Sequence, residues 1–143
     1  MGATGDDLEE VLGRFLQRRN RMRLYSGMLT HAPDGVDKSN YPVLSGLERL
    51  GPRTAAQLAL EVGLDRSRVS RHADRFEELG LLRRVPDPLD GRGSLLILTA
   101  AGEAAVADWR GALARHLDQV IADWPDGLAD AVVEGLGRLM DRE

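Results

Sequence analysis

Residues 64–82, LDRSRVSRHADRFEELGLL, decide the fold of this 143-residue chain. Asp65 can cap a helix, Gly80 can end it, and the apolar residues between them recur at helical spacing. Upstream, Thr54 is followed by a glutamine at the spacing of a capping box, and Gly63 ends this shorter helix. Two helices joined by so tight a connection are typical of a helix-turn-helix.

One further helix and a hairpin complete this unit. Ser39 or Asn40 can cap a helix that has one apolar face, and Gly51 ends this helix. Residues 81–85 and 94–98 are apolar and predict two strands, while the Pro, Gly and Asp residues between them predict a long, turn-rich tip. A hairpin directly behind a helix-turn-helix is called a wing. The predicted fold class is therefore mainly α, a winged helix-turn-helix lobe with flanking helices.

Amphipathic helices are predicted on both sides of the lobe. Residues 8–28 are expected to form one long helix, Thr99 caps a second that Pro125 breaks, and Leu128 lies at the start of a last one. We expect these outer helices to be too distant in sequence for the lobe to need them. The predicted organisation is a single domain, 1–143, with the winged lobe at 39–98 and dimerisation helices at 8–30 and 99–141.

The apolar stripes of the outer helices predict a homodimer. A chain of this length is too short to wrap them into a second core, and uncovered stripes of this kind usually bind a partner. A second copy of the chain is the most economical partner. The residues expected at the dimer interface are Leu12, Phe15, Trp109, Leu113, Leu117, Leu136 and Leu139.

The distribution of charge favours a lobe that binds nucleic acid. The whole chain has a net charge of −4, but residues 53–94 hold eight arginines against seven acids. Several of these arginines fall in the first two turns of the helix after Gly63, the part of a recognition helix that enters the major groove. An arginine-rich solvated helix face is the competing interpretation. The side chains predicted to contact DNA from this helix are Arg66, Ser67, Arg68, Ser70, Arg71 and Arg75.

Three motifs together resemble the MarR family of bacterial transcription regulators. They are the stretch 64–82, DPLDGR at 87–92 and LILTAAG at 96–102. The resemblance covers nearly the whole chain. It implies a winged helix-turn-helix homodimer that binds a pseudo-palindromic operator in double-stranded DNA. It further implies that Ser67, Arg68, Ser70 and Arg71 read the major groove, that Arg92 enters the minor groove, and that Asp90 orients Arg92 through a salt bridge.

The same resemblance implies a repressor that a small ligand relieves. In that family the ligand is often aromatic or phenolic and binds between the DNA-binding lobe and the dimer helices. Met22, Tyr25, Met28 and Tyr41 are the candidates for lining such a pocket, and a place in the hydrophobic core is the competing interpretation for all four.

Other functional classes find little support. The chain has no cysteine, which excludes disulfides, thiolate metal sites and thiol-based sensing. His31, His72 and His116 are far apart and lack metal-ligand spacing, so we expect no metal and no cofactor. Without a phosphate-binding glycine motif or a nucleophile motif, we expect no enzyme. No apolar run approaches the roughly 20 residues of a membrane span, so we expect a cytoplasmic protein.

One alternative function is a winged-helix adaptor that binds other proteins and has no specific DNA site. The arginines of the recognition helix and Arg92 disfavour it. An adaptor has no need for a guanidinium group at the tip of its wing.

Overall fold

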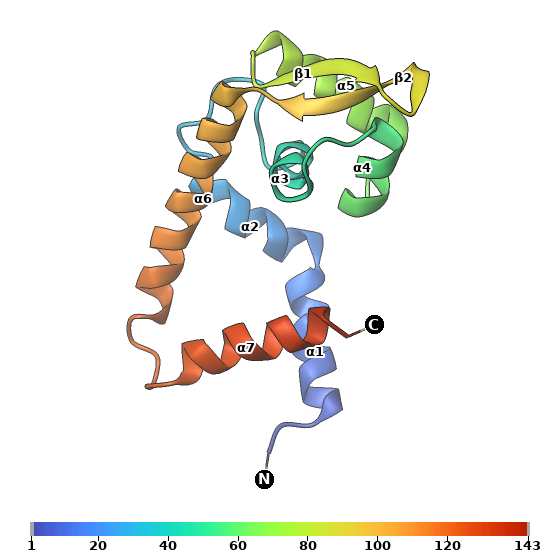
Figure 1. Ribbon diagram of the computed structural model, residues 1–143. Helices are drawn as coiled ribbons and strands as arrows, with labels where there is room; N and C mark the ends of the chain where they lie inside the picture. The colour runs from blue at the N-terminus through green and yellow to red at the C-terminus, as the bar shows by residue number, and fades with distance from the viewer. Residues whose placement is uncertain (1, 143) are drawn as a thin grey trace.

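The computed structural model describes residues 2–142, which form seven helices and one β-hairpin (Figure 1). The lobe of α3, α4, α5 and the hairpin lies at one end, and α6 leads from it to α7 at the other. The mainly helical, winged helix-turn-helix fold class is confirmed. The elements are α1 (Gly5–Leu16), α2 (Arg18–Met28), α3 (Tyr41–Leu50), α4 (Ala55–Val62), α5 (Arg66–Glu78), β1 (Leu82–Asp87), β2 (Asp90–Leu98), α6 (Ala100–Ile121) and α7 (Leu128–Met140).

The helix-turn-helix forms as its capping residues predict. The Thr54 side chain accepts a hydrogen bond from the Gln57 N–H, and the Gln57 side chain accepts one from the Thr54 N–H. Gly63 then ends α4 in the left-handed conformation, with φ of 71°. Asp65 caps α5 directly afterwards, so the short turn brings α5 back against α4.

The wing has a shorter tip than the sequence predicts. β1 and β2 pair antiparallel out to Asp87 opposite Asp90, so that only Pro88 and Leu89 form the tip. The expected long loop is therefore wrong. The pairing register shifts between Pro86 and Asp87. Pro86 cannot donate a ladder hydrogen bond, and the irregularity accommodates it while the pairing continues to Asp87 opposite Asp90.

The hydrophobic core lies in the lobe but includes residues of the flanking helices. Phe76 of α5 and Leu44 of α3 are fully buried. Met28 of α2 and Val106 and Trp109 of α6 are buried in the same cluster. The expectation that the lobe does not need its outer helices is therefore wrong, because residues of α2 and α6 are buried in one cluster with residues of α3 and α5.

Trp109 belongs to this core and not to the predicted dimer interface. Only 8% of its surface is exposed, and its ring meets Tyr41 edge-on with the centroids 6.1 Å apart. Tyr41 in turn meets Tyr25 edge-on at 5.2 Å, so three aromatic rings join α2, α3 and α6. An ion pair of 2.8 Å between Glu48 and Arg110 is a second link from α3 to α6.

The start of α6 is fixed to the base of the hairpin. The Thr99 hydroxyl accepts a hydrogen bond from the Gly102 N–H and donates one to the Gly80 carbonyl. Gly102 lies so close to Leu81 that a β-carbon on it would come within 2.0 Å of the Leu81 carbonyl oxygen. Only glycine allows this approach of α6 to the chain before β1.

The helix predicted over residues 8–28 is in fact two helices. Gln17 leaves the helical conformation, with ψ of 136°, and separates α1 from α2. The Asn20 side chain donates a hydrogen bond to the Arg14 carbonyl, one of the acceptors that a helix end leaves free. The hydrophobic spacing continues across the break, so periodicity alone could not reveal it.

The start of α3 is also held differently from the prediction. Asn40 precedes α3, but its side chain donates to the Gly35 carbonyl and accepts from the Asp37 N–H. The Asp37 carboxylate accepts hydrogen bonds from the N–H groups of Ser39 and Asn40. Neither Ser39 nor Asn40 therefore caps α3 with its side chain. The loop between α2 and α3 is instead stiffened from within.

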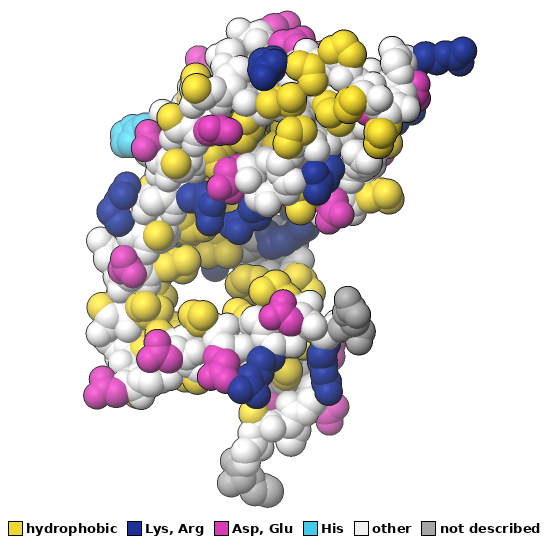
Figure 2. All heavy atoms as spheres, in the orientation of Figure 1, with side chains coloured by type: hydrophobic (Ala, Val, Ile, Leu, Met, Phe, Trp, Pro, Cys, Tyr) yellow, Lys and Arg dark blue, Asp and Glu magenta, His cyan; other side chains and the backbone are white. Residues whose placement is uncertain are grey.

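The outer helices keep much of their apolar surface uncovered. Neither α1 nor α7 contains a buried residue. Leu136 of α7 is 41% exposed, and Phe15 of α1 is 51% exposed. Figure 2 shows an opening between the lobe and α7 with hydrophobic side chains along its border. No helix within residues 2–142 is both long and apolar enough to cross a membrane.

Candidate nucleic-acid interface

A dense set of hydrogen bonds fixes the first turn of α5. The Asp65 carboxylate accepts hydrogen bonds of 2.7 Å from both the Arg68 N–H and the Ser67 hydroxyl. These two bonds, that of Ser67 first, lower the pKa of Asp65. An ionised Asp65 therefore caps the helix and fixes the backbone from which the following arginines extend.

The structure brings most of the predicted contact residues together on the outer side of this helix. Ser70 is less exposed than the others, and its backbone carbonyl accepts a hydrogen bond of 3.1 Å from Arg84. A contact of the Ser70 side chain with DNA stays a prediction. The exposed side chains of the first two turns are Arg66, Ser67, Arg68 and Arg71.

The Arg75 side chain lies against the loop between α2 and α3. Its side chain covers Gly35 so closely that a β-carbon there would come within 2.5 Å of Arg75 Nε. Its guanidinium also lies 3.9 Å from the Glu78 carboxylate. Arg75 is exposed as well, with 54% of its side chain accessible, and its predicted contact with DNA stays a prediction.

Arg84 is a residue that joins two parts of the candidate site, and the sequence analysis did not single it out. From β1, its guanidinium lies 2.9 Å from the Asp74 carboxylate and 3.3 Å from that of Glu77, and it donates to the Ser70 carbonyl. All three partners belong to α5, so Arg84 fixes the wing to the recognition helix. The available signal was an arginine within an apolar strand, facing acids one turn apart on the preceding helix.

The tip of the wing is held by its own aspartates. Asp87 accepts a hydrogen bond of 2.9 Å from the Leu89 N–H, and Asp90 accepts one of 3.0 Å from the Arg92 N–H. The expected salt bridge between Asp90 and the Arg92 guanidinium is absent from the described structure. Asp90 therefore fixes the backbone of Arg92, and the exposed guanidinium stays free to meet a ligand.

His72 lies half-buried on α5, on the side that faces the loop between α2 and α3. Burial lowers its pKa, and the neighbouring Asp37 carboxylate opposes this effect. Burial by itself would raise the pKa of Asp37, but hydrogen bonds from Ser39 and Asn40 outweigh it and the pKa is lowered. The two shifts favour the neutral form of His72 and the ionised form of Asp37. Within residues 2–142, no group of three or more His, Asp or Glu residues could hold a metal ion.

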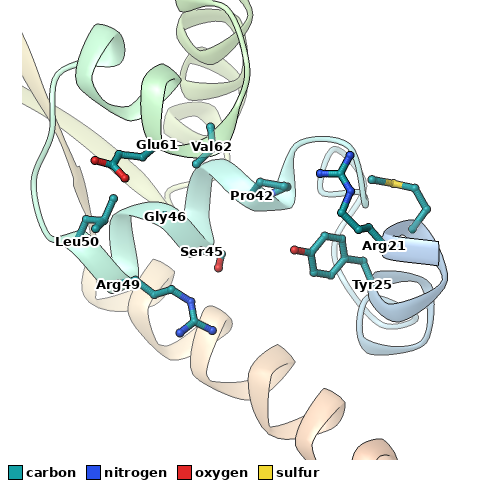
Figure 3. A pocket seen from close by; sticks show the side chains of 10 residues that line it. Arg21, Tyr25, Pro42, Ser45, Gly46, Arg49, Leu50, Glu61 and Val62 are labelled. Carbon is teal, nitrogen blue, oxygen red and sulfur yellow. The ribbon is translucent and has the colours of Figure 1, made fainter. Parts of the chain in front are cut away.

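A cavity of about 340 Å³ separates α2 from the lobe (Figure 3). Met22 and Tyr25, both predicted to line a ligand pocket, line it, and Arg21 and Arg49 face it from the two sides. Met28 and Tyr41 were predicted there as well, but they are 5% and 2% exposed and lie in the core. The remaining lining residues are Pro42, Ser45, Gly46, Leu50, Glu61 and Val62.

Relatives of known sequence match this arrangement. A family model described as the MarR family matches residues 34–93. The HTH-type transcriptional regulator YxaD of Bacillus subtilis, itself uncharacterized, is 32% identical over 118 residues, which span 82% of this chain and 79% of YxaD. The multiple antibiotic resistance protein MarR of Salmonella typhimurium is 31% identical over 108 residues, which span 73% of this chain and 74% of that protein.

Solved structures extend the match to the whole chain. MarR from E. coli in its apo form has a TM-score of 0.74 at 20% identity, covering 99% of this chain and 100% of its own. The PcaV transcriptional regulator of Streptomyces coelicolor, in complex with its natural ligand, has a TM-score of 0.62 at 27% identity and covers 99% and 98%. The fold and these matches define a winged-helix transcription regulator of a DNA-binding class. The chain belongs to the MarR family.

Proposed function

We propose that this chain is a homodimeric repressor that binds an inverted-repeat operator in double-stranded DNA. The observation that carries the proposal is the direct connection between α5 and the wing through Arg84. This connection ties the base of the wing to the helix that carries Arg71, and Arg92 lies at the tip of the same wing. A helix and a wing joined in this way suit binding in one major groove and the minor groove beside it.

A second copy of the chain would complete the regulator. The uncovered apolar side chains on α1, α6 and α7 support a dimer built from the helices at 8–30 and 99–141, around the lobe at 39–98. In that dimer, Leu12, Phe15, Leu113, Leu117, Leu136 and Leu139 would contact the partner. Two recognition helices related by a two-fold axis sit about 34–36 Å apart, so the operator half-sites should be centred about 10 bp apart.

We also propose that the cavity between α2 and α3 binds the effector. Arg21 and Arg49 supply two guanidinium groups, while Met22 and Tyr25 supply an apolar wall. This combination favours an aromatic ring that carries a carboxylate or phenolate group. A ligand held between α2 and the lobe would change the spacing of the two recognition helices and so weaken DNA binding.

Fluorescence anisotropy with DNA from upstream of the coding sequence tests the repressor proposal. We expect specific binding that falls by orders of magnitude between about 50 and 200 mM salt, because several phosphates are neutralised. Footprinting should show an inverted repeat, and 4-hydroxybenzoate serves as the effector probe. If the protein binds this DNA no better than unrelated DNA, the adaptor function is favoured instead.

A further inference from the structure

Leu89 at the wing tip is the most exposed large hydrophobic side chain within residues 2–142, at 94%. It contributes nothing to the core, and the residues around it in the tip are charged or exposed. A single exposed leucine needs no explanation by itself. Leu89, however, lies at the end of the wing that we propose contacts DNA, and its exposure at that position needs an explanation.

The turn that carries Leu89 is held on both sides. Asp87 accepts a hydrogen bond from the Leu89 N–H, and Asp90 accepts one from the Arg92 N–H. The side chains of Leu89 and Arg92 are both exposed, yet they extend from backbone that is fixed before any ligand arrives. A preorganised contact of this kind loses less conformational entropy when it binds.

We propose that Leu89 is an apolar minor-groove contact that enters DNA beside Arg92 and selects A·T pairs there. The proposal rests on the DNA-binding function proposed above. Proteins that bind the minor groove commonly combine arginine with an apolar side chain. A G·C pair presents an amino donor on the floor of this groove, whereas an A·T pair presents acceptors only. A leucine leaves acceptors without partners against either pair, but against G·C it would also bury the amino donor that protrudes from the groove floor, so A·T is preferred.

The test compares Leu89→Ala with Leu60→Ala. Leu60 is 88% exposed but lies on α4, so the second variant removes the same side chain from another surface. We expect Leu89→Ala to bind operator at least about tenfold more weakly, since an apolar contact is lost. The slope of log affinity against log salt should not change, because no charge is removed. Leu89→Met, which keeps the apolar reach, should restore most of the affinity.

Operator variants with G·C under the wing tip give the second readout. They should bind the unmodified protein more weakly than the A·T version, and Leu89→Ala should reduce this difference. Unchanged affinity of Leu89→Ala, or an altered salt slope, would overturn the role of Leu89 while leaving DNA binding intact. Failure of the unmodified protein to bind DNA would instead refute the proposed function, and the Leu89 contact with it.

Discussion

Four arginines of the lobe divide into two pairs by what they touch. Arg71 and Arg92 extend into solvent, and no ion pair within the described residues engages either of them. Arg84 is bound to three acceptors on α5, and Arg75 covers the α2–α3 loop. Sequence alone shows four similar residues. The two groups predict different consequences of mutation.

The two exposed arginines should have separable effects on DNA binding. Arg71→Ala should relax the preference at one base pair in each half-site by about 1–3 kcal/mol, because a bidentate contact to guanine is lost. Arg92→Ala should weaken every operator variant, most of all those with A·T-rich flanks, because the minor-groove contact acts through groove shape. Competition binding against a library of single-base operator variants measures both. Equal affinity of Arg92→Ala and the unmodified protein would argue against the wing as a DNA contact.

Arg84→Ala should reduce both stability and DNA affinity, although Arg84 itself need not touch DNA. Its side chain is 24% exposed, and its acidic partners are more exposed, so we expect a loss of about 1–2 kcal/mol in the free energy of unfolding. Urea denaturation measures the stability, and anisotropy measures the affinity. Arg84→Lys is the matched control. The lysine ammonium cannot reproduce the planar guanidinium of arginine, so Arg84→Lys should recover only part of the lost stability and of the lost DNA affinity.

His72 should make the folded state less stable in mild acid. Its pKa in the folded chain lies below the ordinary 6.5, so the unfolded chain takes up the proton first as the pH falls. The free energy of unfolding should therefore decrease from pH 6.5 downward until the folded-state pKa is reached. The carboxylates of Asp37 and Asp65 act in a separate range, since their lowered pKa values stabilise the fold until the pH falls below 3.8.

His72→Gln should flatten the pH dependence near 6, measured by urea denaturation at intervals between pH 5 and pH 8. His116→Gln provides the control, because His116 is an exposed histidine on α6. If the two variants show the same pH profile, the burial of His72 does not govern stability in this range.

At the level of elements, the sequence predicts those features that depend on neighbours in the chain. The capping box at Thr54 and the caps at Asp65 and Thr99 are all present, because each needs only a side chain and an N–H within three residues. The two apolar stretches after Gly80, with the turn residues between them, correctly predicted the hairpin. These signals were enough for the fold class.

Features that depend on distant contacts could not be predicted in this way. The burial of Trp109 depends on α2 and α3 packing beside α6, and the break at Gln17 leaves the hydrophobic spacing intact. The dependence on distant contacts also limits what the sequence predicts about the candidate site. Exposure of Arg71 follows from its place on the helix, whereas the role of Arg84 requires that β1 lie against α5.

Gly102 at the start of α6 offers a test of element packing. A β-carbon there would meet the Leu81 carbonyl at 2.0 Å, and backbone on both sides cannot move easily. Gly102→Ala should therefore lower the free energy of unfolding by at least about 2 kcal/mol. Gly27→Ala in α2 has open space around it and should be neutral or stabilising, since alanine favours helix. Thermal denaturation of both variants makes the comparison.

At the level of the whole molecule, the central prediction is a dimer. Sedimentation equilibrium should give about 31 kDa, twice the 15.7 kDa of one chain. Leu136→Asp should shift the mass to that of a monomer, because a carboxylate buried without a partner costs several kcal/mol. Ala131→Asp places the same charge about 140° away around α7 and should remain dimeric. A single-chain mass for the unmodified protein at micromolar concentration would be incompatible with this assembly.

Helices α1 and α7, which bury no residue within their own chain, have a consequence for the lifetime of the regulator in a cell. Isolated helices of 12 and 13 residues are marginal in water, so in the proposed dimer these two should fray whenever the partner is absent. Proteases cleave such segments first. Newly made chains at low abundance would then be degraded until enough accumulate to pair. The concentration at which pairing occurs would thus set a threshold for the amount of active regulator, without any dedicated control of its synthesis.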